Sequence, residues 1–485
     1  MNKELRRVST IVVAMFLALL CSTSIIGVIQ QESLRQNEFN VRTIYASFSA
    51  ERGPILVDGA PVARSTPVDD AFSFLRVYED GPLWSAATGY FTLDQGLTGI
   101  EYELNDYLSG TANAQFLDRL TSILTGQSPQ GAAVALTLDS EVQQVARDAL
   151  GDLSGAVVAF TPSTGAILAM VSTPDFDPGD LAVHDSAAVI DRYNSLLADP
   201  GEPLQNRAIA GGLYHPGSTF KLVVSAAALE SGAYGPDSEL PNPSRLQLPD
   251  SDNIIANSGG GSCGGGERVT IATALRLSCN IPFAELGQNL GWDAIFAQAT
   301  AFGFGDPSLR IPLPVTPSVF PEVDSEAQLM LASFGQASVR VTPLQMAMVS
   351  AAIANDGTLM RPNLVDSVLA PDLAVLTSFE PSVYGTPINT STAAALTAMM
   401  IQNVAAGAAS NARIEGVDVA GKTGTAQNGE GEPYTLWFTG FAPADDPQVA
   451  VAVVIEDGGG LGQSGFGNTV AAPIARQVIE AVLGR

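Results

Sequence analysis

The sequence predicts an α+β protein built on a central antiparallel sheet that is covered by helices and carries an inserted helical subdomain. Three observations lead to this fold class. An uncharged run near the N-terminus predicts one transmembrane helix. Short apolar stretches separated by turn residues then predict a small N-terminal β-rich domain. The long C-terminal part alternates strands, hairpins and helices, and the 485 residues suffice for two or more domains.

The first 29 residues divide into a basic tail and an apolar run. Residues 1–7 carry Lys3, Arg6 and Arg7, whereas the 22 residues 8–29 contain no charged side chain. A helix of this length crosses a hydrocarbon core of about 30 Å, and the basic side chains place the tail in the cytoplasm. A cleaved signal peptide fits less well, because the run is longer than the apolar segment of such a peptide. We therefore expect a single-pass membrane protein with the remaining chain outside the cytoplasm.

The rest of the chain divides near residue 131. Residues 30–131 are expected to form the first, β-rich domain, with 126–131 as a linker. Residues 132–485 are expected to form the second domain. Its expected elements are a strand over 133–138, a helix over 139–150, a hairpin of 156–161 and 166–172, helical regions over 216–232 and 267–290, strands over 436–442 and 449–456, and a closing helix over 470–483.

Charge and composition exclude several classes of function. The formal net charge is −27, from 50 acidic and 23 basic residues, so the surface repels nucleic acid. Two histidines and three cysteines argue against a metal site of these residues, and we expect neither a metal nor a cofactor. Only Lys3, Lys221 and Lys422 are lysines, against 20 arginines. Because a buried lysine can lose its proton and an arginine cannot, this scarcity indicates that lysine serves where a titratable amine is needed.

Cys263 and Cys279 lie 16 residues apart in the part of the chain expected outside the cytoplasm. Thiols in an oxidising compartment tend to pair, so we expect a disulfide that closes the glycine-rich loop 259–266. Two free thiols remain the alternative. The third cysteine, Cys21, lies in the apolar run, where the bulky Leu20 before it argues against a lipid-attachment site.

The segment around Lys221 has the pattern of a nucleophile and its base. Pro216 and Gly217 precede Ser218 and an apolar run follows, which predicts a helix that begins near Ser218. Ser218 and Lys221 are three residues apart and would share one face of this helix. A desolvated lysine can take the proton of the hydroxyl, and N–H groups at the helix start can stabilise an oxyanion. The alternatives are a capping serine beside a surface lysine, or His215 as the base, although Pro216 and Gly217 turn the chain between His215 and Ser218.

Two Ser-x-Asn segments compete for a third polar group in this site. Residues 251–253 (Ser-Asp-Asn) lie in a polar loop without an adjoining helix, whereas Ser278 and Asn280 lie between two apolar helical runs, 269–277 and 281–290. A tight junction between helices can hold polar side chains rigidly in a cleft. We therefore favour Ser278 and Asn280.

The stretch 416–427, GVDVAGKTGTAQ, fits two motifs. It matches the phosphate-binding loop G-x-x-x-x-G-K-T, and it contains K-T-G, a strand motif of enzymes that acylate a serine. A phosphate loop needs a buried strand before it and a helix that starts at Gly-Lys-Thr. Residues 412–415 are not an apolar strand, and residues 425–433 include two glycines and a proline. We therefore expect no nucleotide site, and interpret 416–427 as an edge strand that turns toward 436–442 and can pair with an extended peptide.

Together the three motifs resemble those of the penicillin-recognising serine transferases and hydrolases. They are, in chain order, Ser218-x-x-Lys221, Ser278-x-Asn280 and Lys422-Thr423-Gly424. The first two serines are 60 residues apart, and 142 residues separate the second and third motifs, which is similar to penicillin-binding transpeptidases. The resemblance covers nearly all of 132–485. With its membrane anchor and without a recognisable glycosyltransferase domain, the chain resembles a monofunctional class B penicillin-binding protein of the short actinobacterial type.

The resemblance implies a role for each motif residue. Ser218 would attack the D-Ala-D-Ala carbonyl of a peptidoglycan stem peptide, Lys221 would take its proton, and Ser278 would relay it to the leaving D-Ala. The backbone N–H groups of Ser218 and Thr425 would form the oxyanion hole. Asn280 would hold a substrate amide, and the terminal carboxylate, which β-lactams mimic, would be bound by Lys422, Thr423, Gly424 and Thr425. The amine of a neighbouring stem would resolve the acyl-enzyme and form the cross-link.

The resemblance leaves related functions open. A D,D-carboxypeptidase or a β-lactam sensor shares all three motifs, and a catalytically silent scaffold for cell-wall assembly is a further alternative. A β-lactamase fits less well, since no Glu-x-x-x-Asn segment in the inserted helical part suggests a base for deacylation. One departure is that Thr435 and Leu436 stand where the family often has His-Ala. Such enzymes work with polytopic glycan-polymerising glycosyltransferases, so a partner of this kind is expected.

Overall fold

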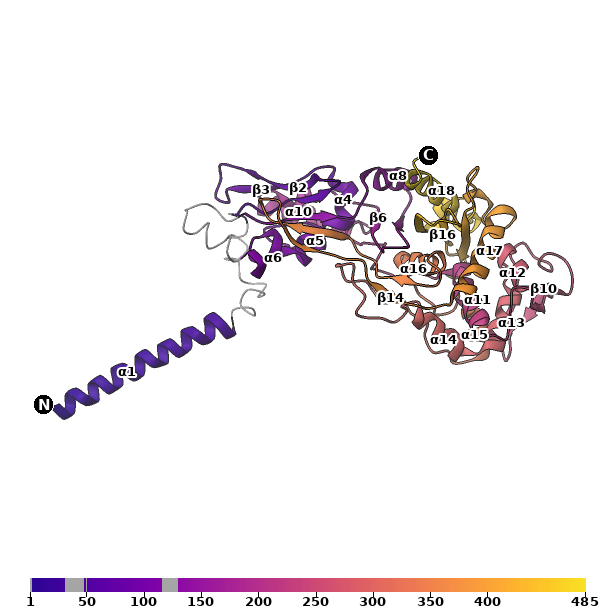
Figure 1. Ribbon diagram of the computed structural model, residues 1–485, viewed down its shortest axis with the longest axis horizontal. Coiled ribbons are helices and arrows are strands. Elements are labelled where there is room, and N and C mark those ends of the chain that lie inside the picture. Colours follow the sequence, from indigo (N-terminus) through magenta and orange to yellow (C-terminus); the bar gives the residue numbers. More distant parts are fainter. Residues whose placement is uncertain (1, 31–47, 49, 116–129) are drawn as a thin grey trace.

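The chain begins with a long apolar helix. The computed structural model of the protein describes residues 2–30, 48, 50–115 and 130–485. In it, helix α1 (Asn2–Ser24) continues into the π-helical turn η1 (Ile25–Ile29). Within the described chain, Leu5–Gly27 is the one helical segment long and apolar enough to cross a membrane, and none of it is buried against the protein (Figure 1). These 23 residues fit a single-pass membrane anchor, as expected for residues 8–29.

A six-stranded sheet forms the part of the body that follows the anchor in the sequence. Its strands are, in spatial order, β13 (Val375–Ser378), β12 (Val365–Leu369), β4 (Ala133–Leu136), β1 (Ile55–Val57), β2 (Ala60–Pro67) and β3 (Phe74–Tyr78). Strands β1 and β4 are parallel, and the other neighbours are antiparallel. Because β4, β12 and β13 belong to 132–485, the sheet crosses the boundary expected at residue 131. Most of the expected linker 126–131, residues 126–129, lies outside the described residues.

A buried ion cluster ties this sheet to the short helices beside it. These are α4 (Gly81–Thr88), α5 (Gly99–Glu103), α6 (Asn105–Leu108) and η2 (Asn113–Gln115). Glu101 accepts from Arg52 Nε at 2.5 Å and from Arg76 Nε at 2.7 Å, and all three side chains are buried. Burial raises the pKa of Glu101, but the two guanidinium groups outweigh it and hold that pKa below its usual value. The pairing makes burial of these charges tolerable.

The second sheet is the centre of the larger part of the molecule. Its strands, in spatial order, are β15 (Ala420–Ala426), β16 (Thr435–Ala442), β17 (Val449–Ile455), β5 (Gly155–Phe160) and β6 (Ile167–Thr173). All neighbours are antiparallel. Every residue of β16 and β17 is buried, which requires cover on both faces. The expected central antiparallel sheet is confirmed, with β15 at its edge.

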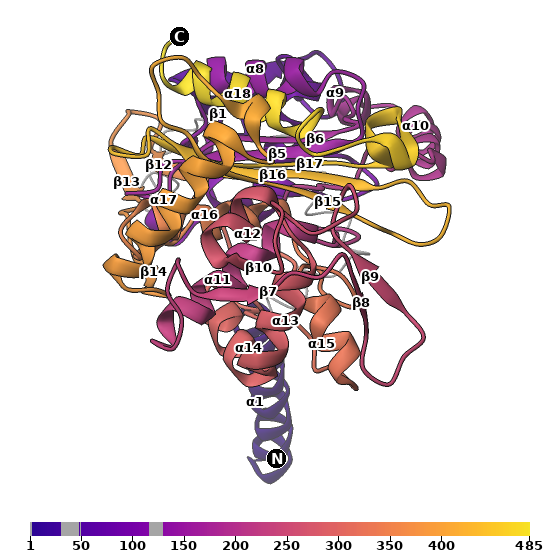
Figure 2. The same cartoon turned by 90° about the vertical axis from the view of Figure 1, so that its right-hand side faces the viewer.

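Helices cover this sheet on both faces. Helices α8 (Ser140–Leu150) and α18 (Ala471–Val482) pack on one face, and α16 (Pro343–Ala354) packs on the other (Figure 2). Asp139 begins α8 because its carboxylate accepts from the N–H groups of Glu141 and Val142. Helix α16 is buried almost all round, which makes it the core between the sheet and the helical subdomain.

The inserted subdomain is mainly helical. It contains η3 (Gly217–Phe220), α11 (Lys221–Glu230), α12 (Ile271–Leu277), α13 (Ile281–Leu290), α14 (Trp292–Ala301), α15 (Glu326–Ala332) and α17 (Thr390–Ala406), with the short strands β7 (Glu239–Pro241), β8 (Arg245–Gln247), β9 (Ile254–Ala256) and β10 (Arg268–Thr270). The remaining elements are α9 (Gly179–Ala182), α10 (Ser186–Ala198), β11 (Leu359–Met360), β14 (Val383–Gly385), η4 (Ser410–Ala412), η5 (Asp457–Gly460) and η6 (Gly462–Ser464). The helical region expected over 267–290 begins instead with a strand, because β10 pairs with β7 before Thr270 caps α12.

Candidate active site

Ser218 and Lys221 lie at the start of a buried helix. Ser218 is in the tight turn η3, and α11 begins at Lys221. The turn needs Gly217, whose φ is +51° and whose α-carbon packs against Ala426 of the edge strand. The Nζ atom of Lys221 lies 2.9 Å from the Oγ atom of Ser218. The structure thus brings the two residues of the first motif into hydrogen-bond contact.

Lys221 is completely buried among groups that favour its neutral form. Burial, reinforced by the nearby charge of Lys422, holds the pKa of Lys221 well below its usual value of 10.5. Its Nζ atom is also 2.8 Å from the carbonyl oxygen of Ser278 and 2.9 Å from Oδ1 of Asn280. Both of these oxygens can only accept, so they take the two N–H bonds of a neutral amine. The remaining lone pair then points to Ser218, as a proton acceptor requires.

The junction between α12 and α13 carries Ser278 and Asn280. Ser278 ends α12 in the left-handed region, at φ +61°, which is uncommon for a residue other than glycine and often marks a functional site. Cys279, the residue between them, forms a disulfide with Cys263. The Oδ1 atom of Asn257 accepts from the N–H groups of Asn280 and Ile281, at 2.9 and 3.0 Å. These contacts hold the junction in a fixed shape.

The amide of Asn280 is engaged at both ends. Its Oδ1 atom contacts Lys221, and its Nδ2 group donates to the carbonyl oxygen of Ala256 at 3.1 Å. Any substrate amide that binds Asn280 must therefore share these atoms with the protein. Asn280 is fixed in orientation before a ligand arrives, which reduces the entropy lost on binding.

Lys422 contacts Ser278 from the edge strand β15. It lies on β15, with its Nζ atom 2.8 Å from Oγ of Ser278 and 2.7 Å from the carbonyl oxygen of Thr423. Burial lowers the pKa of Lys422 from 10.5 to about 7. An anionic ligand would raise this pKa again, because an opposite charge favours the ammonium form. Ser278 thus bridges the two lysines through its carbonyl oxygen and its hydroxyl.

The edge strand and the turn of Ser218 approach each other closely. A side chain at Gly424 would meet the carbonyl oxygen of Pro216 at 2.9 Å, so only glycine fits without a shift. Thr423 donates through Oγ1 to the carbonyl oxygen of Ala408, and Oγ1 of Thr425 accepts from the N–H of Gly467. The residues of the third motif therefore lie beside Ser218.

Two competing interpretations find no support in the geometry. Residues 251–253 form the turn of the β8–β9 hairpin, whereas Lys221 contacts Ser278 and Asn280. His215 accepts from Nη1 of Arg340 at 2.6 Å, and burial followed by the charge of Arg340 lowers its pKa to about 4. A neutral imidazole occupied in this way is a poor base for Ser218.

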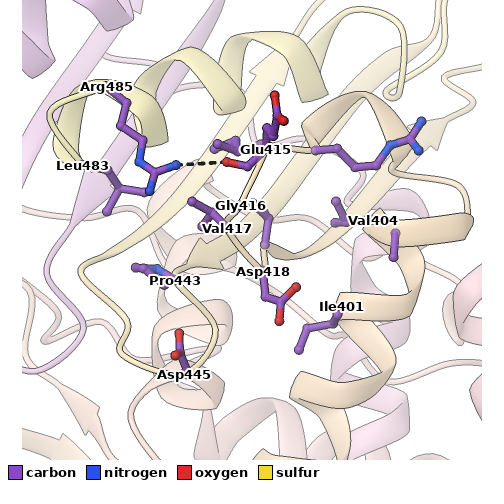
Figure 3. Close-up of a pocket in the computed structure, with 14 residues that line it drawn as sticks. Ile401, Val404, Glu415, Gly416, Val417, Asp418, Pro443, Asp445, Leu483 and Arg485 are labelled. Carbon is purple, nitrogen blue, oxygen red and sulfur yellow. Dashed lines mark hydrogen bonds between the residues drawn. The ribbon is translucent and has the colours of Figure 1, made fainter.

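A large cavity opens at the other end of the GVDVAGKTGTAQ stretch. Its volume is about 940 Å³, and it is lined around Gly416 and Val417 by acidic Glu415, Asp418 and Asp445 (Figure 3). Arg485 Nη1 donates to the carbonyl oxygen of Glu415. Residues 420–426 form a strand where a phosphate loop would start a helix, which argues against a nucleotide site. The edge strand expected over 416–427 is confirmed for residues 420–426, whereas residues 416–419 form a turn and an irregular segment before it.

Sequence reasoning missed two contributors to the site. Asn257 lies in an irregular segment after β9, and nothing in its local pattern connects it with the α12–α13 junction. Gln336 follows α15 and reaches the end of β15 at Gln427. Both act across long sequence separations, so only the folded chain reveals them.

Two family descriptions match the chain. Residues 155–480 match "Penicillin binding protein transpeptidase domain", and residues 52–134 match "Penicillin binding protein A dimerisation domain". The chain is similar to the peptidoglycan D,D-transpeptidase PbpA of Mycolicibacterium smegmatis, with 41% identity over 100% of this chain and 99% of the relative. It is 38% identical to the protein of the same name from Mycobacterium tuberculosis, with the same coverage.

Solved structures agree with this likeness. The chain is similar to penicillin-binding protein A from M. tuberculosis in its ceftriaxone acyl-enzyme complex, with a TM-score of 0.88, 38% identity, and coverage of 90% of this chain and 100% of that one. For the penicillin G acyl-enzyme complex of the same protein the TM-score is 0.85, with the same identity and coverage. Both structures are acyl-enzyme complexes of that one relative with a β-lactam.

Proposed function

Because the chain belongs to the penicillin-binding protein transpeptidase family, we propose that Ser218 is the nucleophile of its acyl-transfer reaction and Lys221 the base that activates it. The protein is a serine-type peptidoglycan D,D-transpeptidase that acts on stem peptides and binds β-lactams. The observation that carries the residue assignment is the contact of 2.9 Å between the Nζ atom of Lys221 and the Oγ atom of Ser218, in a buried place that favours a neutral amine. No other described side chain contacts Ser218 in a way suited to this role.

Acylation begins when Lys221 takes the hydroxyl proton of Ser218. The Oγ atom attacks the carbonyl carbon of the penultimate D-Ala, and the charge that develops on the carbonyl oxygen meets the N–H groups of Ser218 and Thr425. The hydroxyl of Ser278 accepts from Lys422 and keeps its own proton to donate, so it can pass a proton to the amine of the leaving D-Ala and regain one from the protonated Lys221. In the free protein Lys221 contacts the carbonyl oxygen of Ser278, so this relay requires the ammonium group of Lys221 to turn toward the hydroxyl. The amine of a second stem then attacks the ester, and the same groups act in reverse.

The terminal carboxylate of the donor binds at the third motif. The ammonium group of Lys422 supplies the charge, and Gly424 leaves room for the backbone to approach. The hydroxyl of Thr425 accepts from Gly467 and can donate to the carboxylate, whereas the hydroxyl of Thr423 donates to Ala408 in the free protein and must turn to the ligand. Asn280 orients an amide of the donor. A β-lactam would use the same contacts through its own carboxylate and acylate Ser218.

The remaining assignments concern location and partners. We propose that residues 1–7 lie in the cytoplasm, that 8–29 cross the membrane, and that 30–131 and 132–485 lie outside as a non-catalytic and a transpeptidase domain. The basic residues before the apolar helix support this orientation. A polytopic glycan-polymerising glycosyltransferase would bind through the anchor and residues 30–131, where it could deliver new glycan to the cleft.

Labelling with a fluorescent penicillin tests the assignment. The wild type should form a covalent adduct, and Ser218→Ala should form none while keeping its melting temperature. Unlabelled, folded wild type would refute the enzyme assignment. Incubation with a stem peptide, with and without an acceptor amine, then separates a transpeptidase from a carboxypeptidase, because only the former yields a cross-linked product in preference to the free acid.

A further inference from the structure

The open edge of β15 offers few free backbone groups to a peptide. Strand residues point their N–H and C=O groups alternately to the two sides, so Thr423, Thr425 and Gln427 share one side. The carbonyl oxygen of Thr423 contacts Lys422 Nζ, which also contacts Ser278 in the cleft. This side is therefore the open edge that faces Ser278, and Thr425 presents its N–H and C=O there.

The side chain of Gln336 contacts this edge at Gln427, the next residue after Thr425 whose backbone groups point to the same side. The side-chain amide of Gln336 faces the N–H and C=O groups of Gln427. We assign its Nε2 group toward the carbonyl oxygen and its Oε1 atom toward the N–H, the orientation that satisfies both groups with two hydrogen bonds of 3.2 Å each. An amide in this position imitates the backbone of a paired strand. Both edge groups of Gln427 are consequently taken before any peptide binds.

The backbone of Gln336 is held against the nucleophile turn. The N–H of Gln336 donates to the carbonyl oxygen of Leu331, and the N–H of Gly217 donates to the carbonyl oxygen of Gly335 at 3.0 Å. A side chain at Gly335 would lie 2.0 Å from the carbonyl oxygen of Gly217, so the two loops touch through their backbones. The position of Gln336 relative to Ser218 is therefore fixed by the fold.

We propose that Gln336 is a specificity-determining residue that limits backbone pairing of the donor peptide to Thr425. This inference rests on the proposed transpeptidase function. In an antiparallel pairing, the penultimate D-Ala of the donor exchanges both hydrogen bonds with Thr425. The next pair along the ladder would join Gln427 to the donor residue two positions earlier. The side chain of Gln336 fills that place. The edge strand therefore pairs only with the terminal D-Ala-D-Ala segment, and the upstream residues of the stem make no backbone hydrogen bonds with β15.

The test compares donors of two lengths. The short donor is an acetylated D-Ala-D-Ala dipeptide, and the long donor is an acetylated tetrapeptide with α-linked residues and the same two D-Ala at its end. The readout is the ratio of kcat/KM for D-Ala release, long over short. In the wild type this ratio should stay near one, because the upstream residue finds no partner. In Gln336→Met, which keeps the length of the side chain and removes the amide, the ratio should rise about tenfold, the effect of two ordinary hydrogen bonds.

A second readout needs no substrate. In the free full-length protein, the N–H of Gln427 should exchange with deuterium at least about ten times faster in Gln336→Met than in the wild type, because its acceptor is gone. Gln477→Leu, on the exposed surface of α18, is the matched control and should change neither readout. A general loss of fold in Gln336→Met would accelerate exchange everywhere, and fluorescent-penicillin labelling would fall with it.

The outcomes separate this inference from the function on which it rests. Normal penicillin labelling of Gln336→Met, with a raised long-over-short ratio, supports the role of Gln336. Normal labelling with an unchanged ratio, or unchanged exchange at Gln427, overturns it and leaves the transpeptidase assignment intact. If the wild type is neither labelled nor active on the short donor, both the function and this inference are refuted.

Discussion

Replacement of either buried lysine by arginine should slow acylation, but by very different factors at the two positions. Arginine keeps a positive charge and cannot lose its proton, and at either position it adds bulk to a fully buried site. Lys221 lies 2.9 Å from Ser218 and is expected to act as the base, so Lys221→Arg should slow acylation by about 10² to 10⁴, the usual contribution of a general base. Lys422 is expected to act as a cation, so Lys422→Arg should lose roughly tenfold or less.

The assay is the rate of acylation by a fluorescent penicillin, measured from pH 5 to pH 10 on protein that melts at a comparable temperature. A base works in its neutral form, so the wild-type rate should rise with pH through the lowered pKa of Lys221. A carboxylate-binding cation works in its charged form, so the rate should fall again as pH rises through the pKa of Lys422, about 7 in the free protein. Lys422→Arg should abolish this fall and keep the rise.

The acylation rates of Lys221→Arg and Lys422→Arg, compared with each other, test whether Lys221 is the base. Arginine adds bulk at both buried sites, so the cost of overpacking is measured for each variant as the change in its melting temperature. Equal losses in both variants would mean that bulk, not proton transfer, explains the effect. A Lys221→Arg variant that retains most of the wild-type rate would refute Lys221 as the base.

Two further changes are expected to alter stability. Lys422→Met should raise the melting temperature at pH 6 and have a smaller effect at pH 10, because the charged amine is disfavoured in the fold. The cost is full below the folded pKa of about 7, on the order of 5 kcal/mol, and vanishes above the unfolded value of 10.5; an equal shift at both pH values would contradict this. Cys263→Ala should lower the free energy of unfolding by about 3 kcal/mol, as expected for a loop of this length. Denatured wild type should show one free thiol without reductant and three with it, and equal counts would exclude the disulfide.

Sequence patterns predicted the elements of the central sheet well because its hairpin and its capped helix are each formed by residues close together in the sequence. The β5–β6 hairpin is closed by a Pro-Ser-Thr-Gly turn, and α8 begins at Asp139, whose carboxylate caps it. The six-stranded sheet was harder to foresee. Strand β12 pairs with β4 across more than 200 residues, and periodicity within β12 carries no information about its partner. The sequence therefore contained no indication that strands from both sides of residue 131 join in one sheet.

In the site, too, the residues close together in the sequence were predictable and the contacts between distant segments were not. Ser218 and Lys221 are one helical turn apart, and the choice of Ser278 with Asn280 over residues 251–253 followed from the rigidity of a helix junction. Asn257 and Gln336 reach the site from irregular segments, where neither helix nor strand period applies. Their function is to satisfy backbone groups of other segments, and such a function has no signature in the local sequence.

The two buried lysines explain why the site cannot be built from arginine. Lys221 and Lys422 both contact Ser278, so their like charges disfavour a state in which both are protonated. Burial and the charge of Lys422 both lower the pKa of Lys221, whereas burial alone lowers the pKa of Lys422, to about 7, so we expect a state in which Lys221 is neutral and Lys422 is protonated. That state leaves a neutral amine beside Ser218 and a cation where the donor carboxylate binds. The environments of two identical side chains thus separate the base from the anion-binding group. Arginine at position 221 would remove the base, whereas arginine at position 422 would keep the cation.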